Sequence, residues 1–124
     1  MEESIFIEFV TQGSKTVATS DYCTLGSTAN LKDNIQSKTY YGHEFDTALK
    51  MESGTSITLN LEDTEFAYIL LITDSGSKRI KANGSQFTTA SDGTLKLKFN
   101  GDPSTVTFTK YDSLNVYGII LIKE

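Results

Sequence analysis

Cysteine and long hydrophobic runs are nearly absent from this sequence of 124 residues. Cys23 is the single cysteine, so no internal disulfide can form, and we expect it to be buried and structural. Such a chain suits the cytosol, or secretion from an organism that does not depend on disulfides. No apolar run approaches the roughly 20 residues of a membrane span, and Met1 is followed by two glutamates instead of a leader. We therefore expect no membrane partner, and a domain cut from a longer polypeptide.

Residues for catalysis are equally scarce. His43 is the one histidine, and no serine elbow or partner cysteine accompanies it, so we interpret it as a surface turn residue. The 16 carboxylates show no spacing that identifies a glycosidase pair. The acidic cluster Glu62-Asp63-Thr64-Glu65 offers oxygen ligands for structural calcium but lacks the alternating spacing of a dedicated loop. We expect neither an enzyme nor a cofactor or metal site.

Tryptophan is missing, although the chain has six tyrosines and seven phenylalanines. Proteins that bind flat crystalline polysaccharide use a row of large exposed aromatic rings, and tryptophan offers the largest stacking surface. Its absence argues against that class. Tyr40, Tyr41 and Tyr111 lie in polar contexts where a ring can be exposed, whereas Tyr68 and Tyr117 lie in apolar runs and are expected in the core.

Positive charge is also in short supply, since the net charge is −5. Residues 1–76 carry 4 basic and 12 acidic side chains, whereas residues 77–124 carry 7 basic and 4 acidic ones. A net-negative protein binds polyanions poorly without a specific site, so we expect no nucleic-acid partner. An anionic partner of any kind needs a local basic site.

The pattern that is present is hydrophobic alternation with a period of two, which is typical of half-buried strands. In LKMESGTSITLNL at 49–61, apolar residues alternate with threonine and asparagine after a polar turn. The nearly continuous apolar run at 66–73 predicts a strand buried on both faces. Further strands are expected at 4–10, 35–41, 78–82, 86–89, 94–99, 105–110 and 116–123.

Turn signals separate these strands. Asn83-Gly84, Asp92-Gly93 and Asn100-Gly101 favour the primed hairpin turns, because both residues of each pair tolerate positive φ. No ten-residue stretch shows a helical period. We therefore predict an all-β chain that forms an antiparallel β-sandwich, jelly-roll-like, in a single domain over residues 1–124.

Basic side chains recur on predicted strands. Arg79 and Lys81 alternate with apolar residues and should point outward, as should Lys96 and Lys98. This pattern indicates either one basic face or the solvated side of a hairpin. Lys110 has the inward parity of its strand but stands where that strand ends, so its side chain should leave the core at the rim of the sandwich.

Three segments of the chain carry a resemblance: SKTYYGHEFDTALKMESGTSI at 37–57, KRIKANG at 78–84 and TFTKYDSLNVYGI at 107–119. They resemble, in the same order, segments of the family 77 carbohydrate-binding modules, small β-sandwich modules attached to bacterial pectate lyases. The likeness covers about the last ninety residues of the chain. Two positions depart from it: Tyr111 stands where glycine is frequent in the family, and Ala48 where cysteine is frequent.

The resemblance implies which residues bind. Lysines of that family recognise the carboxylates of uronic acids, and the matching positions are Lys38, Lys50 and Lys110. Each lies next to a turn or strand end, where we expect an exposed side chain whose loss costs little stability. Lys81 is the reserve candidate, and Tyr41 and Tyr111 are the candidate ring contacts.

The function that follows is a non-catalytic module that binds pectin, specifically homogalacturonan or polygalacturonic acid. The implied partners are a pectic polysaccharide and a covalently linked catalytic domain, a pectate lyase that the module holds on the plant cell wall. We expect a secreted, monomeric domain. Two alternatives stay open: a module for neutral glycans with tyrosines as its platform, and an adhesion or interaction domain that pairs through an exposed edge strand.

Overall fold

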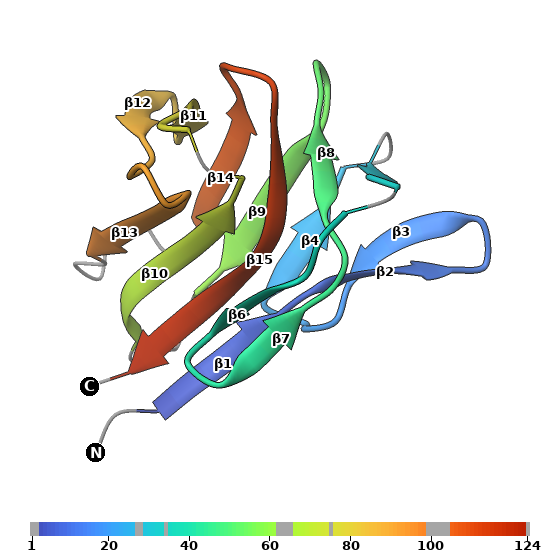
Figure 1. The fold of residues 1–124 in the computed structure, drawn as a ribbon, viewed down its shortest axis with the longest axis horizontal. Coiled ribbons are helices and arrows are strands. Elements are labelled where there is room, and N and C mark those ends of the chain that lie inside the picture. The colour runs from blue at the N-terminus through green and yellow to red at the C-terminus, as the bar shows by residue number, and fades with distance from the viewer. Residues whose placement is uncertain are drawn as a thin grey trace.

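Two antiparallel β-sheets face each other across one hydrophobic core (Figure 1). The structure is a computed structural model that describes residues 3–26, 29–33, 35–61, 66–74, 76–98 and 105–123. The predicted all-β sandwich is confirmed, and the described residues include no helix that could cross a membrane. The acidic cluster at 62–65 and the turn at 100–101 lie outside the described residues.

Each sheet mixes strands from distant parts of the chain. The six-stranded sheet runs β13 (Thr94–Lys98), β10 (Phe66–Thr73), β15 (Leu114–Lys123), β8 (Leu49–Met51) and β5 (Asn30–Leu31), and β1 (Glu3–Ile7) also pairs with β15. The five-stranded sheet runs β12 (Ser85–Thr88), β11 (Arg79–Ala82), β14 (Thr105–Lys110), β9 (Ser56–Asn60) and β4 (Cys23–Leu25).

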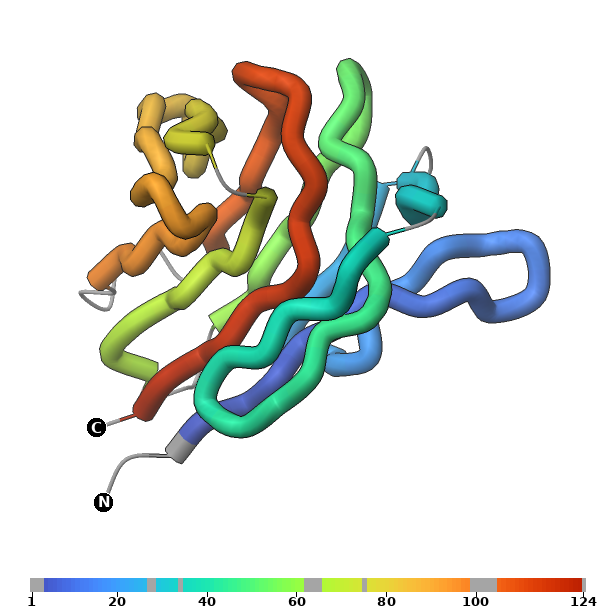
Figure 2. Tube along the Cα trace, viewed as in Figure 1, coloured from blue at the N-terminus to red at the C-terminus, as the bar shows by residue number. Residues whose placement is uncertain are grey.

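Two hairpins stand apart from the main sheets. β2 (Phe9–Gln12) pairs with β3 (Lys15–Ala18), and β6 (Lys38–Tyr40) pairs with β7 (His43–Phe45). The trace shows β2–β3 projecting from one side, whereas β6–β7 lies in front of β1 and β15 (Figure 2). A second apolar cluster beneath β6–β7 contains Phe45, Tyr117 and Ile120, so this hairpin covers the outer face of the six-stranded sheet.

The strand pattern matches the expectation in its main features. The stretch at 49–61 forms β8, a polar turn and β9, and the apolar run at 66–73 forms β10, most of whose residues are buried. Asn83 and Gly84 have φ of 51° and 82°, as a primed hairpin turn requires. The strand expected at 4–10 divides at Glu8, because β1 pairs with β15 whereas β2 turns away to pair with β3.

His43 is not a surface turn residue, so that prediction was wrong. The turn falls one residue earlier, at Tyr41 and Gly42, where φ is 53° and 77°. His43 lies in β7, its ring stacks on Phe6 with 4.6 Å between centroids, and its Nε2 contacts the Glu8 carboxylate. It therefore helps to hold the hairpin against β1.

Cys23 is buried in the core between the sheets, as predicted. Burial raises the pKa of its thiol to about 12, so the thiolate that a nucleophile needs is disfavoured.

Candidate functional site

A polar cleft lies at one end of the sandwich, between the β8–β9 turn and the end of β14. Its volume is about 390 Å³, at the small end of the range of ligand sites. Both the β8–β9 turn and the β14–β15 connection are at the top of Figure 1. The cleft is lined by Ser53, Gly54, Thr55, Ser56, Thr109, Lys110 and Tyr111. Its wall thus offers hydroxyl groups, one ammonium and one aromatic ring, and no carboxylate.

Lys110 reaches this cleft because, as predicted, it has the inward parity of β14 but stands where the strand ends. It follows Val106 and Phe108 on the core side of β14 and pairs with buried Ile80, but β14 ends at this residue. The side chain is half-buried and makes no hydrogen bond or ion pair with another described residue. Its ammonium is therefore available to an anion in the cleft.

Thr55 lies behind the wall of the cleft as a buried polar residue. The residue is 2% exposed, and its backbone N–H donates to the Glu52 carbonyl at 3.0 Å. Its Oγ1 is buried and has no hydrogen-bond partner in the described part of the chain. Most buried hydroxyl groups are paired, so this one is an exception, and because it is buried it does not face a molecule in the cleft.

Tyr111 stands at the mouth of the cleft with two cations beside it. The Arg79 guanidinium lies 4.3 Å from the ring centroid and the Lys81 ammonium lies 5.8 Å from it. Arg79 donates to both oxygens of the Asp112 carboxylate, from Nε at 3.0 Å and from Nη2 at 3.2 Å. These hydrogen bonds lower the pKa of Asp112 and raise the pKa of Arg79, so both groups stay charged.

Lys50 lies on a different surface. Its neighbours Leu49 and Met51 are buried in the core, so Lys50 points away from the core on the six-stranded sheet, as predicted. Its cross-strand partners are Asn115 and Asn30. No hydrogen bond or ion pair joins Lys50 to another described residue, and its ammonium is free to bind.

Lys38 is engaged within the protein. Its Nζ donates to the Thr73 carbonyl at 2.5 Å and to the Asp92 carbonyl at 3.4 Å, and it lies 5.1 Å from the centroid of the Tyr117 ring. Desolvation lowers the pKa of Lys38, and the carboxylates of Asp74 and Asp92 oppose that shift. The expectation of an exposed Lys38 is corrected here: the side chain is half-buried, because the β6–β7 hairpin packs on the six-stranded sheet.

The candidate residues do not form a single cluster, and the tip of β6–β7 lies at the end of the sandwich away from the cleft (Figure 1). Lys110, Tyr111 and Lys81 surround the cleft and the adjoining face of the five-stranded sheet. Lys50 lies on the six-stranded sheet, and Lys38 lies in the β6–β7 hairpin that covers this sheet. Asn115, the partner of Lys50, donates to the Asp74 carboxylate near Lys38. Tyr41 is 58% exposed at the tip of β6–β7.

Replacing Lys38 by alanine is expected to destabilise the fold by about 1–2 kcal/mol. The change removes hydrogen bonds from a charged donor to two carbonyl groups, in a half-exposed setting that reduces their contribution. Urea denaturation measures the effect. Lys98→Ala, on an exposed position of β13, is the matched control and should shift stability by less than about 0.5 kcal/mol. Equal stability of the two variants would show that Lys38 has no structural role.

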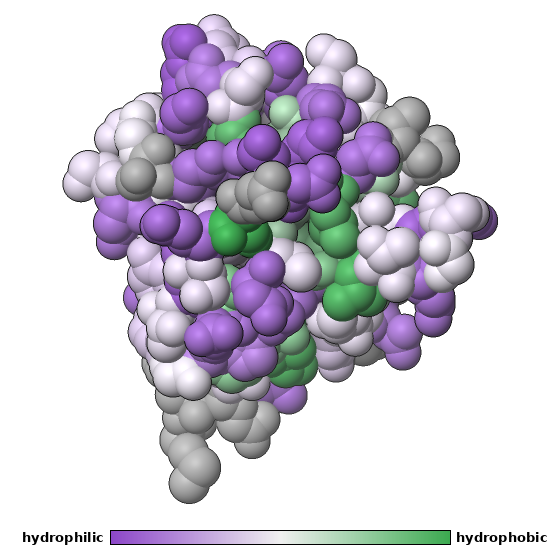
Figure 3. All heavy atoms as spheres, turned by 45° about the vertical axis from the view of Figure 1, so that its right-hand side comes forward, coloured by the Kyte–Doolittle hydropathy of each residue, from purple (hydrophilic) through white to green (hydrophobic). Residues whose placement is uncertain are grey.

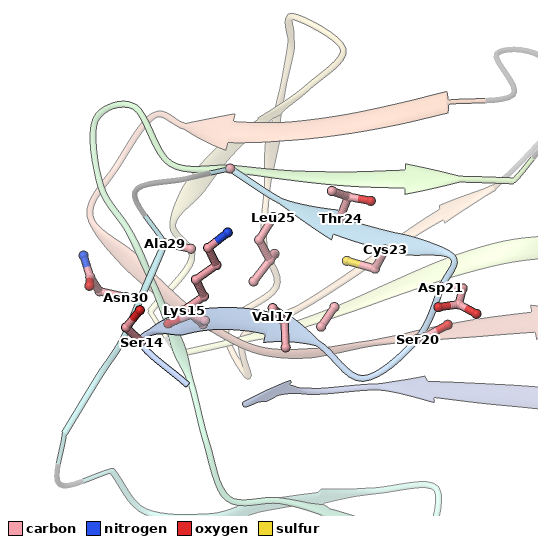
Figure 4. A pocket seen from close by; sticks show the side chains of 13 residues that line it. Ser14, Lys15, Val17, Ser20, Asp21, Cys23, Thr24, Leu25, Ala29 and Asn30 are labelled. Carbon is pink, nitrogen blue, oxygen red and sulfur yellow. The ribbon is translucent and has the colours of Figure 1, made fainter. Parts of the chain in front are cut away.

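A larger cavity of about 730 Å³ lies away from these residues, between β3 and β4. Its lining mixes hydroxyl groups with aliphatic side chains, and Lys15 is directed into it between Ala29 and Leu25 (Figure 4). A space-filling view turned to bring the β2–β3 side forward shows mostly hydrophilic atoms with small hydrophobic patches between them (Figure 3). None of the predicted binding residues lines this cavity.

A rigid β-sandwich that presents a hydroxyl-lined cleft, free lysines and exposed tyrosines has the make-up of a carbohydrate-binding module. The chain belongs to the family Carbohydrate binding module 77, whose profile matches residues 3–119. It is therefore a non-catalytic binding module.

One solved structure supports this assignment. It comes from a study of glycan recognition in the Ruminococcus flavefaciens cellulosome and is 25% identical in sequence, with a TM-score of 0.68. The similarity covers 85% of this chain and 84% of that one. No curated protein is similar to the chain at a significant level.

Proposed function

We propose that this module binds homogalacturonan, the acidic backbone of pectin, through contacts between lysines and galacturonate carboxylates. The observation that carries the proposal is the polar cleft, where no described residue pairs with the Lys110 ammonium and the described lining includes no carboxylate to repel an acidic sugar. Hydroxyl groups of Ser53, Ser56 and Thr109 can bond the sugar hydroxyls. The related R. flavefaciens structure, from work on glycan recognition, supports a glycan as ligand.

The lysines contribute unequally in this proposal. Lys50 and Lys110 each offer an unpaired ammonium, whereas that of Lys38 is already bonded to two carbonyl groups and has one donor left. An exposed lysine–carboxylate pair contributes about 0.2–1 kcal/mol. A few such pairs, less the ordering of flexible side chains, correspond to micromolar or weaker affinity. Linkage to a catalytic domain, a pectate lyase in our proposal, offsets this through avidity on the cell wall.

Binding is expected to weaken as pectin becomes more methyl-esterified and as salt rises. Esterification removes the carboxylate charge, and the Debye length falls from about 10 Å at 0.1 M salt to about 3 Å at 1 M. Affinity gels with de-esterified and highly esterified pectin, each run at both salt concentrations, measure retention. We expect strong retention only on de-esterified pectin at low salt.

The rivals give different outcomes in the same gels. A neutral-glycan module, which the exposure of Tyr41 and Tyr111 would serve, would bind esterified pectin equally well and tolerate salt. An adhesion domain would be retained by neither polysaccharide.

A further inference from the structure

Tyr111 exposes its aromatic ring beside the polar cleft. It is 41% exposed, and with Val10 and Tyr41 it makes up the exposed large hydrophobic residues in the described part of the chain. Its position follows β14 directly, next to Lys110 in the cleft. An aromatic ring beside a polar cleft offers an apolar surface on which the C–H face of a sugar can pack.

The ring is held from beneath. Asp112 fixes the Arg79 guanidinium through two side-chain hydrogen bonds, and the same carboxylate accepts from the Arg79 backbone N–H at 2.9 Å. The Cζ atom of the guanidinium in turn lies 4.3 Å from the Tyr111 ring centroid. A planar cation fixed by a bidentate carboxylate orients an aromatic ring before any ligand arrives, which lowers the entropy cost of binding.

The sheet next to Tyr111 is open and carries no negative charge. None of the outward side chains of β4, β9, β11, β12 and β14 is buried, and none is acidic. They bear hydroxyl or amide groups except for Arg79 and Lys81. By contrast, β6–β7 covers the outer face of the six-stranded sheet. An acidic polysaccharide that leaves the cleft over Tyr111 therefore meets Lys81 and hydroxyl groups. This face lacks negative charge although the net charge of the protein is −5.

We propose that Tyr111 is the platform on which one sugar ring of the bound glycan stacks, that Arg79 and Asp112 position this ring, and that Lys81 meets the carboxylate of the next sugar. This inference rests on the proposed function and deepens it. It places the path of the polyuronate from the cleft over Tyr111 onto the open face of the five-stranded sheet.

Titration calorimetry with polygalacturonic acid tests the platform. Tyr111→Ala is expected to weaken binding about tenfold, which corresponds to about 1.4 kcal/mol. Tyr111→Phe keeps the ring and should bind within about twofold of wild type, since stacking needs no hydroxyl group. Lys81→Ala should weaken binding about three- to tenfold and flatten its salt dependence, because one ion contact is lost.

The absence of tryptophan supplies a direct reporter, since Tyr111→Trp introduces the only indole in the chain. We expect this variant to bind at least as tightly as wild type, with emission that shifts to the blue on adding polygalacturonic acid. Val10→Trp, on an exposed position of β2, is the matched control and should show no shift.

Substitutions of Arg79 in the Tyr111→Trp protein separate positioning from charge. Arg79→Gln should weaken binding and reduce the emission shift. Arg79→Lys keeps the charge but loses the planar, bidentate contact, so it should not restore either signal. Melting temperatures taken alongside confirm that each variant is folded.

These experiments distinguish a failure of the Tyr111 platform from a failure of the proposed function. The platform would be overturned if the wild-type module binds and Tyr111→Ala binds with the same affinity, or if the emission of Tyr111→Trp does not shift. Either result would leave the proposed function standing. Full recovery by Arg79→Lys would overturn the positioning role. Failure of the wild-type module to bind polygalacturonic acid would overturn the proposed function and the platform together.

Discussion

Replacing Lys110 by alanine is expected to weaken binding of polygalacturonic acid by at least tenfold, the largest loss for any single lysine. Lys110 supplies the only ammonium that lines the cleft, and no described residue pairs with it. Because Lys110 is half-buried in the cleft, its contact with a carboxylate should exceed the about 0.2–1 kcal/mol of an exposed pair. A hydrogen bond to a charged group contributes about 1.5–3 kcal/mol, and 1.4 kcal/mol corresponds to about tenfold in affinity. Titration calorimetry at low salt gives the dissociation constants.

Lys98→Ala is the matched control for this prediction, because Lys98 is exposed on β13, which belongs to the other sheet. Lys110→Arg keeps the charge and should retain most of the affinity. A double-mutant cycle then pairs Lys110→Ala with methyl esterification of the ligand. If Lys110 meets a carboxylate, the two changes together should cost much less than their separate effects combined. Additive losses would place Lys110 away from the carboxylates.

The alternation of apolar residues was enough to predict the class of the fold. Isoleucine and leucine at every second position of 57–61 place one face of β9 in the core, and the turn at Asn83-Gly84 fixes the register of β11 against β12. Local pattern could not predict which strands share a sheet. β8 and β9 follow each other in the chain but lie in different sheets, because the turn between them crosses the end of the sandwich.

The position of a site residue could be predicted where it depends on the alternation of inward and outward side chains along a strand. The inward parity of Lys110 and the end of its strand together predicted a lysine at the rim, and the structure places it in the cleft. The burial of Lys38 depends on a contact with Thr73, 35 residues away, which no local pattern reports. The pair of Arg79 and Asp112 was missed for the same reason, since the two residues meet across 33 positions.

The environment of His43 in the β6–β7 hairpin was also beyond what the local sequence pattern could predict. A lone histidine after a glycine in a polar segment indicates a surface turn, yet the ring packs between Phe6 and Phe45, with centroids 4.6 Å and 4.8 Å away. Phe45 is two residues further along β7, whereas Phe6 comes from β1. Only the docking of β6–β7 onto the six-stranded sheet brings Phe6 against His43.

Phe45→Ala is expected to destabilise the protein by about 3–5 kcal/mol, the usual cost of removing a buried phenylalanine. Phe45 is fully buried in the cluster that holds β6–β7 on the six-stranded sheet. Its ring occupies the space above Gly118, where a Cβ would come within 2.5 Å of Cε1, so the fit depends on both residues. A loss of this size is a large part of the roughly 5–15 kcal/mol that stabilises a domain.

Urea denaturation measures this loss, and the melting temperature should fall by roughly 10–20 °C for a chain of this length. Phe45→Leu fills more of the cavity and should cost less than Phe45→Ala. Thr105→Ala, on the open face of the five-stranded sheet, is the surface control and should change stability by less than about 0.5 kcal/mol. A cost below about 1 kcal/mol for Phe45→Ala would mean that the hairpin is not held by its apolar cluster. The contacts of Lys38 and His43 would then have to hold it, and Lys38→Ala would become the more damaging change.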